Sequence, residues 1–375
     1  MIGKLKRMFR GRTLSELDTG SRDNNYNLLR MMAAVAVIFT HSYALSGYVA
    51  LEPLRNAFPD QKVTFARMGV MVFFAISGYL VTKSFVCRGS VAQFIEARVL
   101  RIYPGLVAAI LFSLGVAAWA TTLPLERFLS HGHTARYLLV NTTMLLPHVQ
   151  LTLPGVFRDL PNFGVNGSIW TLPSEVRMYV FVGLFGVLGV LKSRLLFPVA
   201  VLGLGALCLS NPALSSMLVG VDYLAIYFAI GAFCYLFRSV IPISTPLMVL
   251  FLLALVAALG TPMFGLMAYA TVAYGTFWFA YVPGGVLRHY NRIGDYSYGT
   301  YIYAWPVQQV ILSNAPDMMP LPLAAFATLS TLPFAIVSWH LLEHPVLRLK
   351  GRTVMSRMAG TRRRLMTMVR ARKQR

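Results

Sequence analysis

The sequence predicts an all-α fold, a polytopic transmembrane helical bundle of about ten spans with both termini in the cytoplasm. Of its 375 residues, 57% are hydrophobic and only 13% are charged, and the mean hydropathy is +0.61. Soluble domains carry about a quarter charged residues, so the surplus of apolar side chains is expected to lie in lipid. The 34 Lys and Arg outnumber the 13 Asp and Glu, giving a formal charge of +21. This composition excludes a disordered chain, a collagen and a disulfide-stapled secreted module.

The predicted spans are continuous apolar stretches of about 17 to 22 residues, each long enough to cross a hydrocarbon core of about 30 Å. In chain order they are 28–47, 66–86, 103–121, 171–190, 194–210, 217–237, 244–260, 264–282, 297–314 and 321–342. Only Gly260-Thr261-Pro262 separates the seventh stretch from the eighth, so this pair is the least clearly divided. The first stretch follows a basic segment but lacks a small-residue cleavage site, which favours a retained signal anchor.

The basic residues give each span a direction, because cytoplasmic loops of membrane proteins carry an excess of Lys and Arg. Basic residues gather before the first span, after the tenth, and in every second loop between them. The alternate loops hold few: Arg55, Lys62, Arg127, Arg136 and Arg158. This alternation predicts that both termini are cytoplasmic.

The chain is expected to divide into a basic cytoplasmic N-terminal tail over 1–24, a membrane domain over 25–348 and a basic cytoplasmic tail over 349–375. Within the membrane domain, 122–170 forms an outer loop that caps the outer face. The C-terminal tail could bind nucleic acid, but attraction to anionic membrane lipids explains it more simply, so no nucleic-acid partner is predicted.

Three outer-loop histidines, His131, His133 and His148, raise the alternative of a metal site. No carboxylate or cysteine joins them at ligand spacing, so solvated loop histidines are the preferred interpretation. The three cysteines lie far apart and no pair has metal or redox spacing. No metal is predicted.

Ionisable residues inside a span are costly and mark a functional site by default. The first span holds Arg30 and His41, which are 11 residues apart, or about three helical turns and roughly 16 Å, and therefore lie on nearly the same face. Glu175 begins the fourth span and is expected at the depth of His41, where it could orient the imidazole. The alternative for His41 is a hydrogen-bonded polar residue among packed helices.

Arg98 and Arg101 form Arg-x-x-Arg at the cytoplasmic mouth of the third span. Together with Arg30 they could hold the phosphates of a nucleotide-type ligand through charge-assisted hydrogen bonds. The alternative is that they only set the orientation of the span.

Six sequence elements follow one another along the chain. They are Arg30 with His41, Phe73 to Leu80 with Ser77 and Tyr79, Arg98 to Pro104 with Tyr103, the set Asn166, Trp170, Leu172, Glu175 and Tyr179, the run Tyr296 to Tyr303 with Tyr301, and Glu343-His344-Pro345. In this order, these elements resemble the integral-membrane acyltransferase family 3 over about 25–348. One departure is Ala304, which stands where many members have a histidine.

The resemblance implies transfer of an acyl group, commonly acetyl from acetyl-CoA or another acyl-CoA, to a hydroxyl of an extracytoplasmic carbohydrate or glycolipid. Surface polysaccharide and lipopolysaccharide are examples, and the implied location is the bacterial inner membrane. In that interpretation Arg30, Arg98 and Arg101 hold the donor, His41 is the general base or the acyl acceptor, and Glu175 orients His41. Ser77 and Tyr79 are expected beside the cavity. The oligomeric state is not predicted.

Two other classes of function stay open on the sequence. Buried His, Glu and Arg also suit a proton-coupled secondary transporter. An inactive membrane scaffold in polysaccharide assembly could keep the same spans. The joint presence of four residues counts against it: His41, Arg98, Arg101 and Glu175.

Overall fold

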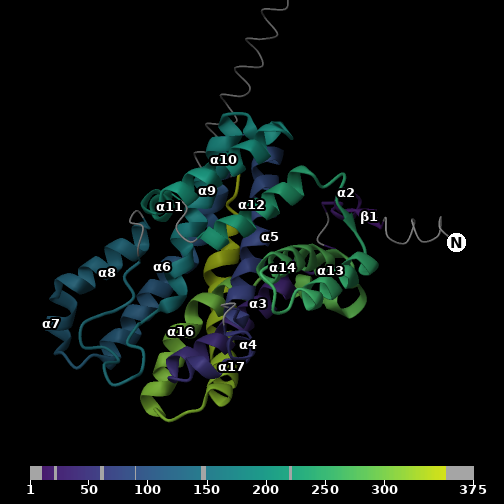
Figure 1. Cartoon of the computed structure of the whole chain (residues 1–375). Helices are drawn as coiled ribbons and strands as arrows, with labels where there is room; N and C mark the ends of the chain where they lie inside the picture. Colours follow the sequence, from purple (N-terminus) through teal and green to yellow (C-terminus); the bar gives the residue numbers. More distant parts are fainter. Residues whose placement is uncertain are drawn as a thin grey trace, which may run out of the picture.

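The computed structural model describes residues 11–20, 23–59, 63–88, 90–144, 149–218 and 222–351, and helices dominate it (Figure 1). The first half contains β1 Arg12–Thr13, α2 Leu14–Leu17, α3 Tyr26–Leu45, η1 Val49–Leu51, α4 Pro53–Ala57, α5 Phe65–Arg88, α6 Val91–Ala120, α7 Leu125–Ser130, α8 Gly132–Thr143, η3 Gly167–Thr171 and α9 Leu172–Val187. The second half contains η4 Val190–Lys192, α10 Leu196–Ser210, α11 Pro212–Leu218, α12 Asp222–Leu236, β2 Pro242–Ile243, α13 Thr245–Ala257, α14 Phe264–Tyr281, η5 Gly285–His289, α15 Tyr290–Ile293, α16 Ser297–Asn314, α17 Pro320–Ser338, the π-helix η6 Trp339–Glu343 and α18 His344–Leu347. The all-α prediction is confirmed.

Each of the ten predicted spans contains a helix, but their lengths differ. Within the described residues, four helices are long and apolar enough to cross a membrane: Tyr26–Leu45, Phe65–Arg88, Val91–Ala120 and Pro320–Leu347. A fifth follows if Pro212–Leu218 and Tyr223–Leu236, which meet at a 60° bend, form one broken span. Residues 219–221, inside the predicted sixth span, lie outside the described residues. The protein is therefore a membrane protein by these helices, and the total of ten spans stays a prediction.

Two apolar helices, α10 and α13, are shorter than a bilayer is thick. With 15 and 13 residues, they measure roughly 20 to 23 Å against about 30 Å of hydrocarbon. Leu202 and Leu209 of α10 are 72% and 87% exposed. Such open leucine faces fit lipid better than water, so these helices are expected to reach the membrane interior without spanning it alone.

Helix α5 lies at the centre of the bundle and packs against α3, α9, α12 and α14. It crosses α12 at very short range, because a Cβ added to Gly78 would lie 2.0 Å from the Phe228 carbonyl oxygen. A Cβ added to Gly231 would lie 2.1 Å from the Ala75 carbonyl oxygen. Two glycines therefore permit the backbone contact that fixes α12 on α5.

A second group of helices packs around α16, which contacts α3, α6 and α17. In Figure 1, α7 and α8 stand beside α6 at one edge of the molecule, and α13 and α14 lie at the opposite edge. The predicted outer loop 122–170 thus contains two helices of its own. Residues 145–148, including His148, lie outside the described residues.

Part of the predicted N-terminal tail packs onto the bundle. The antiparallel strands β1 and β2 pair Arg12 with Ile243, and Leu14 is fully buried. Asp18 accepts hydrogen bonds from Lys83 Nζ at 2.6 and 2.7 Å and from the Tyr79 hydroxyl at 2.7 Å. Lys83, which sits in a predicted span, thereby has a carboxylate partner. Residues 1–10, 21–22 and 352–375 of the two tails lie outside the described residues.

The segment before α9 runs through the protein interior. Asn166 is fully buried, and its Nδ2 donates to Ser113 Oγ and to the Ile302 carbonyl, both at 3.0 Å. Trp305 Nε1 donates to the Gly164 carbonyl at 2.8 Å. Irregular backbone is tolerated at this depth because side chains and neighbouring helices satisfy its polar groups. Helix α9 consequently begins inside the bundle, whereas its predicted span starts at the outer surface.

Candidate active site

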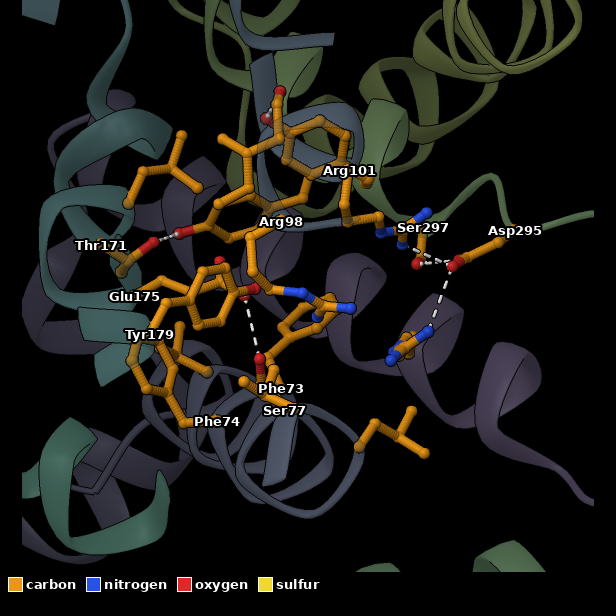
Figure 2. Close-up of a pocket in the computed structure, with 18 of the residues that line it drawn as sticks. Phe73, Phe74, Ser77, Arg98, Arg101, Thr171, Glu175, Tyr179, Asp295 and Ser297 are labelled. Carbon is orange, nitrogen blue, oxygen red and sulfur yellow. Dashed lines mark hydrogen bonds and ion pairs between the residues drawn. The ribbon is translucent and has the colours of Figure 1, made fainter. Parts of the chain in front are cut away.

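A cavity of about 280 Å³ lies where α3, α5, α6, α9 and α16 meet. Its polar lining residues are Arg30, Ser77, Arg98, Arg101, Thr171, Glu175, Tyr179, Asp295, Ser297, Tyr298, Tyr301 and Lys350. We call it the arginine cavity, and Figure 2 shows its side chains converging from these helices. The three arginines predicted to act together are therefore brought together by the fold.

Asp295 connects two of these arginines. Its Oδ2 accepts from Arg101 at 2.6 Å and from Arg30 at 3.1 Å, and its Oδ1 accepts from Ser297 Oγ at 2.5 Å. Burial opposes ionisation of this carboxyl, but the Arg101 and Arg30 guanidinium groups outweigh burial and lower the pKa of Asp295 to about 2. Asp295 thus holds Arg30 and Arg101 in one cluster, a contact that the sequence does not predict.

Arg98 is held differently, by aromatic rings. Its guanidinium carbon lies 5.4 Å from the ring centroid of Tyr179 and 5.9 Å from that of Phe94. Its Nε is buried and has no hydrogen-bond partner among the described residues. Figure 2 shows the side chain extending into the middle of the cavity, between Glu175 and the Asp295 cluster. Arg98 is therefore positioned to donate to a ligand.

Glu175 lies in the arginine cavity and not beside His41. Its Oε1 accepts hydrogen bonds from Ser77 Oγ at 3.0 Å and from the Tyr179 hydroxyl. The expectation that Glu175 orients His41 is wrong for this structure. The cause is the buried segment before α9, which starts that helix inside the bundle and carries Glu175 toward the arginines.

Lys350, which follows α18, also lines the arginine cavity. Burial and the nearby Arg98 and Arg101 lower the pKa of Lys350 to about 8. Four cationic side chains therefore line this cavity against two carboxylates, Glu175 and Asp295. The surplus of positive charge suits an anionic ligand.

A second cavity of about 390 Å³ adjoins the first. Its lining residues include His41, Arg55, Arg67, Trp170 and Tyr223, and we call it the histidine cavity. Val70 and Tyr301 line both cavities, so these two side chains stand between them. The Tyr301 hydroxyl lies 2.9 Å from Thr171 Oγ1, which fixes the ring at this boundary.

His41 packs edge-to-face against Trp305, with ring centroids 4.7 Å apart. Its Nδ1 is buried and has no hydrogen-bond partner in the part of the chain that the structure describes. Arg30 and His41 both come from α3, and one lines each cavity. Helix α3 therefore contributes one of these two residues to each cavity, and their predicted position on one helix face stays a prediction.

The other motif residues differ in position. Trp170 lines the histidine cavity. Tyr79 does not line the arginine cavity, because residues two apart on α5 point in different directions, and it bonds Asp18 instead. The Tyr103 hydroxyl donates to the Thr143 carbonyl at 3.4 Å, which ties α6 to α8. Glu343 is 2% exposed and accepts from Ser338 Oγ at 3.0 Å.

Ala304, where many members of the resembled family have histidine, packs with Ile38 and Ala327. An apolar side chain fills this position, and the neighbouring Trp305 makes the contact with His41. Among the outer-loop histidines, His131 Nδ1 accepts from the His133 backbone N–H at 3.1 Å, a cap on α8. Within the described residues, no group of three His, Cys, Asp or Glu is placed to hold a metal ion.

A family profile described as an acyltransferase domain (Acyl_transf_3) matches residues 23–340. The chain belongs to this acyltransferase family. The acyltransferase is 29% identical over 335 residues to a protein named O-acetyl transferase of Shigella phage Sf6, covering 86% of this chain and 95% of that one. It is 30% identical over 177 residues to Nodulation protein 10 of Rhizobium leguminosarum bv. viciae, covering 44% of each. No solved structure matches the chain. The predicted family and the predicted enzyme class are confirmed.

Proposed function

We propose that this membrane acyltransferase transfers an acyl group, most simply acetyl, from cytoplasmic acyl-CoA to a hydroxyl of an extracytoplasmic carbohydrate. The observation that carries the proposal is the pair of adjoining cavities, one cationic and one containing His41, with only Val70 and Tyr301 common to both. The similarity to a protein named O-acetyl transferase favours a hydroxyl acceptor.

The arginine cavity fits the phosphate end of acyl-CoA. Arg98 presents an unpartnered Nε, and Arg30, Arg101 and Lys350 add positive charge around it. Charge-assisted hydrogen bonds from guanidinium to phosphate are the strong ones in proteins. The pantetheine arm would then pass Val70 and Tyr301 and deliver the thioester to the second cavity.

His41 would act on the thioester from the histidine cavity. In direct transfer the imidazole takes the proton of the sugar hydroxyl, the oxygen attacks the thioester carbonyl, and the carbon–sulfur bond breaks as CoA leaves. In the two-step route an imidazole nitrogen attacks the thioester carbonyl, the carbon–sulfur bond breaks, and CoA leaves as the thiol with the imidazole proton. The sugar hydroxyl then attacks the acyl-imidazole, and its proton returns to the imidazole as the ester forms. Both routes need an imidazole nitrogen free to react, and the unpartnered Nδ1 is compatible with either.

Glu175 is proposed as a positioning residue for the donor. It holds Ser77 and Tyr179, and the Tyr179 ring lies beneath the Arg98 guanidinium. Glu175→Gln is therefore expected to weaken donor binding more than it slows the chemical step. A slower chemical step with unchanged donor affinity would contradict this role and would support a role for Glu175 in the acid–base step.

The direct test is mass spectrometry of surface glycans and glycolipids from cells with and without the gene. An added acyl mass is expected only when the gene is present. Accumulation of a solute without any modified glycan would instead support the transporter. Identical glycans in both cells would contradict the proposal.

A further inference from the structure

The histidine cavity contains two arginines that the proposed transfer does not use. Arg67, in the first turn of α5, and Arg55, in α4, both line it. Among the described residues that line this cavity, none has an acidic side chain. The rest of its polar and aromatic lining is Thr64, His41, Trp170, Tyr223 and Tyr301.

Arg67 is held in place without a carboxylate. Its guanidinium carbon lies 4.1 Å from the ring centroid of Tyr223, and its Nη2 donates to the Tyr269 hydroxyl at 3.3 Å. The described residues contain no acidic group within ion-pair distance of it. Stacking on an aromatic ring partly offsets the cost of removing a cation from water, but no carboxylate of the described residues compensates the charge.

Glu52, an acidic residue between α3 and α4, already accepts three hydrogen bonds. Glu52 is 1% exposed and accepts from the backbone N–H groups of Arg55 and Phe65, at 2.7 and 3.0 Å, and from the Thr40 hydroxyl at 3.2 Å. These bonds cap α4 and fix the connection to α5. Glu52 forms no ion pair with Arg67.

We infer that the carbohydrate acceptor carries a negatively charged group, a carboxylate or a phosphate, which Arg67 and Arg55 hold while a hydroxyl of the same unit lies at His41. The inference rests on the proposed function and adds the charge class of its acceptor. Planar guanidinium groups suit both anions, since each presents two oxygens to the fork of N–H donors. Trp170 provides a ring for contact with the sugar itself.

The test begins with the glycan that gains acyl mass in cells producing the wild-type protein but not in cells producing His41→Ala. Tandem mass spectrometry then locates the acyl group within the repeat. The inference expects it on a unit that bears, or is directly linked to, an acid or phosphate. An acyl group on a neutral unit with neutral neighbours would overturn the inference while leaving the proposed function intact. If no glycan gains acyl mass, the proposed function itself fails.

The purified, deacylated acceptor is next assayed with acetyl-CoA before and after neutralisation, by carboxyl reduction in one arm and phosphate removal in the other. The arm that loses activity identifies the anion. Arg67→Gln is expected to lower kcat/KM for the native acceptor by about 10- to 100-fold, with little effect on the neutralised acceptor and none on the KM for acetyl-CoA. Arg67→Lys should recover part of the loss because it keeps the charge.

Two further variants keep the result interpretable. Arg55→Gln removes the second, exposed charge and should give a smaller loss in the same direction. Arg194→Gln is the matched control, since Arg194 also lies over a ring, that of Phe237 at 5.9 Å, and bonds a hydroxyl, that of Ser239, but lines neither cavity. Equal losses on native and neutralised acceptors in Arg67→Gln would mean a structural role and would overturn the inference.

Discussion

Arg98 and Arg101 are the same residue type one helical turn apart, yet their surroundings differ. Arg101 is bonded to Asp295, whereas Arg98 rests on the rings of Tyr179 and Phe94 with its Nε unpartnered. Arg98→Gln should therefore weaken CoA binding by about 10- to 100-fold and change the thermal unfolding midpoint little. Arg101→Gln should weaken CoA binding and also destabilise the protein, because it leaves the buried Asp295 with one arginine fewer.

Calorimetry of CoA binding in detergent, paired with thermal unfolding of each variant, checks this contrast. Asp295→Asn in the Arg101→Gln background is the control, since removing the orphaned charge should restore part of the stability. Equal effects of Arg98→Gln and Arg101→Gln on both measurements would refute the division of roles.

Lys350 gives the donor site an expected pH dependence. Its pKa of about 8 in the free protein means that it is largely protonated at pH 7 and loses its charge as the pH rises through 8. Affinity for desulfo-CoA, which has no thiol to titrate, should then fall between pH 7 and 9. With Lys350→Arg, the affinity for desulfo-CoA should stay high across this pH range, because the charge is kept. With Lys350→Met, the affinity should stay low across the same range, because the charge is absent. A wild-type affinity that does not change over this range would remove Lys350 from the donor site.

At the residue scale, the sequence singles out several of the ionisable residues that line the two cavities but not the contacts that they make. Arg30, Arg98, Arg101 and His41 stand out because ionisable groups in apolar spans are rare. Asp295 and Lys350 lie outside the predicted spans, so a search for charges within lipid does not find them. The partner of Glu175 is mispredicted because the sequence gives only the depth of a residue in the membrane. Which side chains meet at that depth depends on how the helices pack.

At the scale of elements, the crossing of α5 and α12 depends on two glycines. Gly78→Ala or Gly231→Ala would push a methyl group against the backbone of the partner helix, at 2.0 and 2.1 Å respectively. Each change should lower stability by about 1 to 3 kcal/mol through overpacking and should disturb the histidine cavity, which Tyr223 of α12 lines.

Thermal unfolding in detergent measures this effect, with Gly203→Ala as the matched control. Gly203 is also a helical glycine in an apolar helix, but nothing lies within 4 Å of the position that a Cβ would take there. Alanine at Gly203 should therefore leave stability unchanged or slightly higher. Unfolding midpoints that are the same for all three variants would show that the crossing tolerates a wider separation.

The sequence predicts that a helix lies in each apolar stretch, but it does not predict where each helix begins and ends. Apolar stretches locate a helix in each predicted span, because hydrophobicity and length dominate that choice. The buried path through Asn166 and Gly164 is not visible in hydropathy, since it depends on side chains of α6 and α16 that satisfy its backbone. The π-helix Trp339–Glu343 likewise interrupts a stretch that hydropathy reads as one regular helix.

At the scale of the whole molecule, transfer from a cytoplasmic donor to an outer acceptor requires the two cavities to face different sides of the membrane. Single cysteines introduced at Leu125 of α7 and at Leu349 are both at exposed side chains, 56% and 48% open. With the native cysteines replaced, a membrane-impermeant maleimide added to intact cells should label the first and not the second. Labelling of the second alone would invert the predicted orientation.

The measurement that tests the central claim most directly is acyl transfer by purified His41→Ala in comparison with the wild type, using radiolabelled acetyl-CoA and the acceptor identified from cells. Loss of a general base typically costs a factor of about 10² to 10⁴, and the arginine cavity does not include His41. We predict that His41→Ala binds CoA with wild-type affinity and transfers acetyl at least about 100-fold more slowly. Transfer at the wild-type rate, in correctly folded protein, would contradict the role of His41 in the reaction.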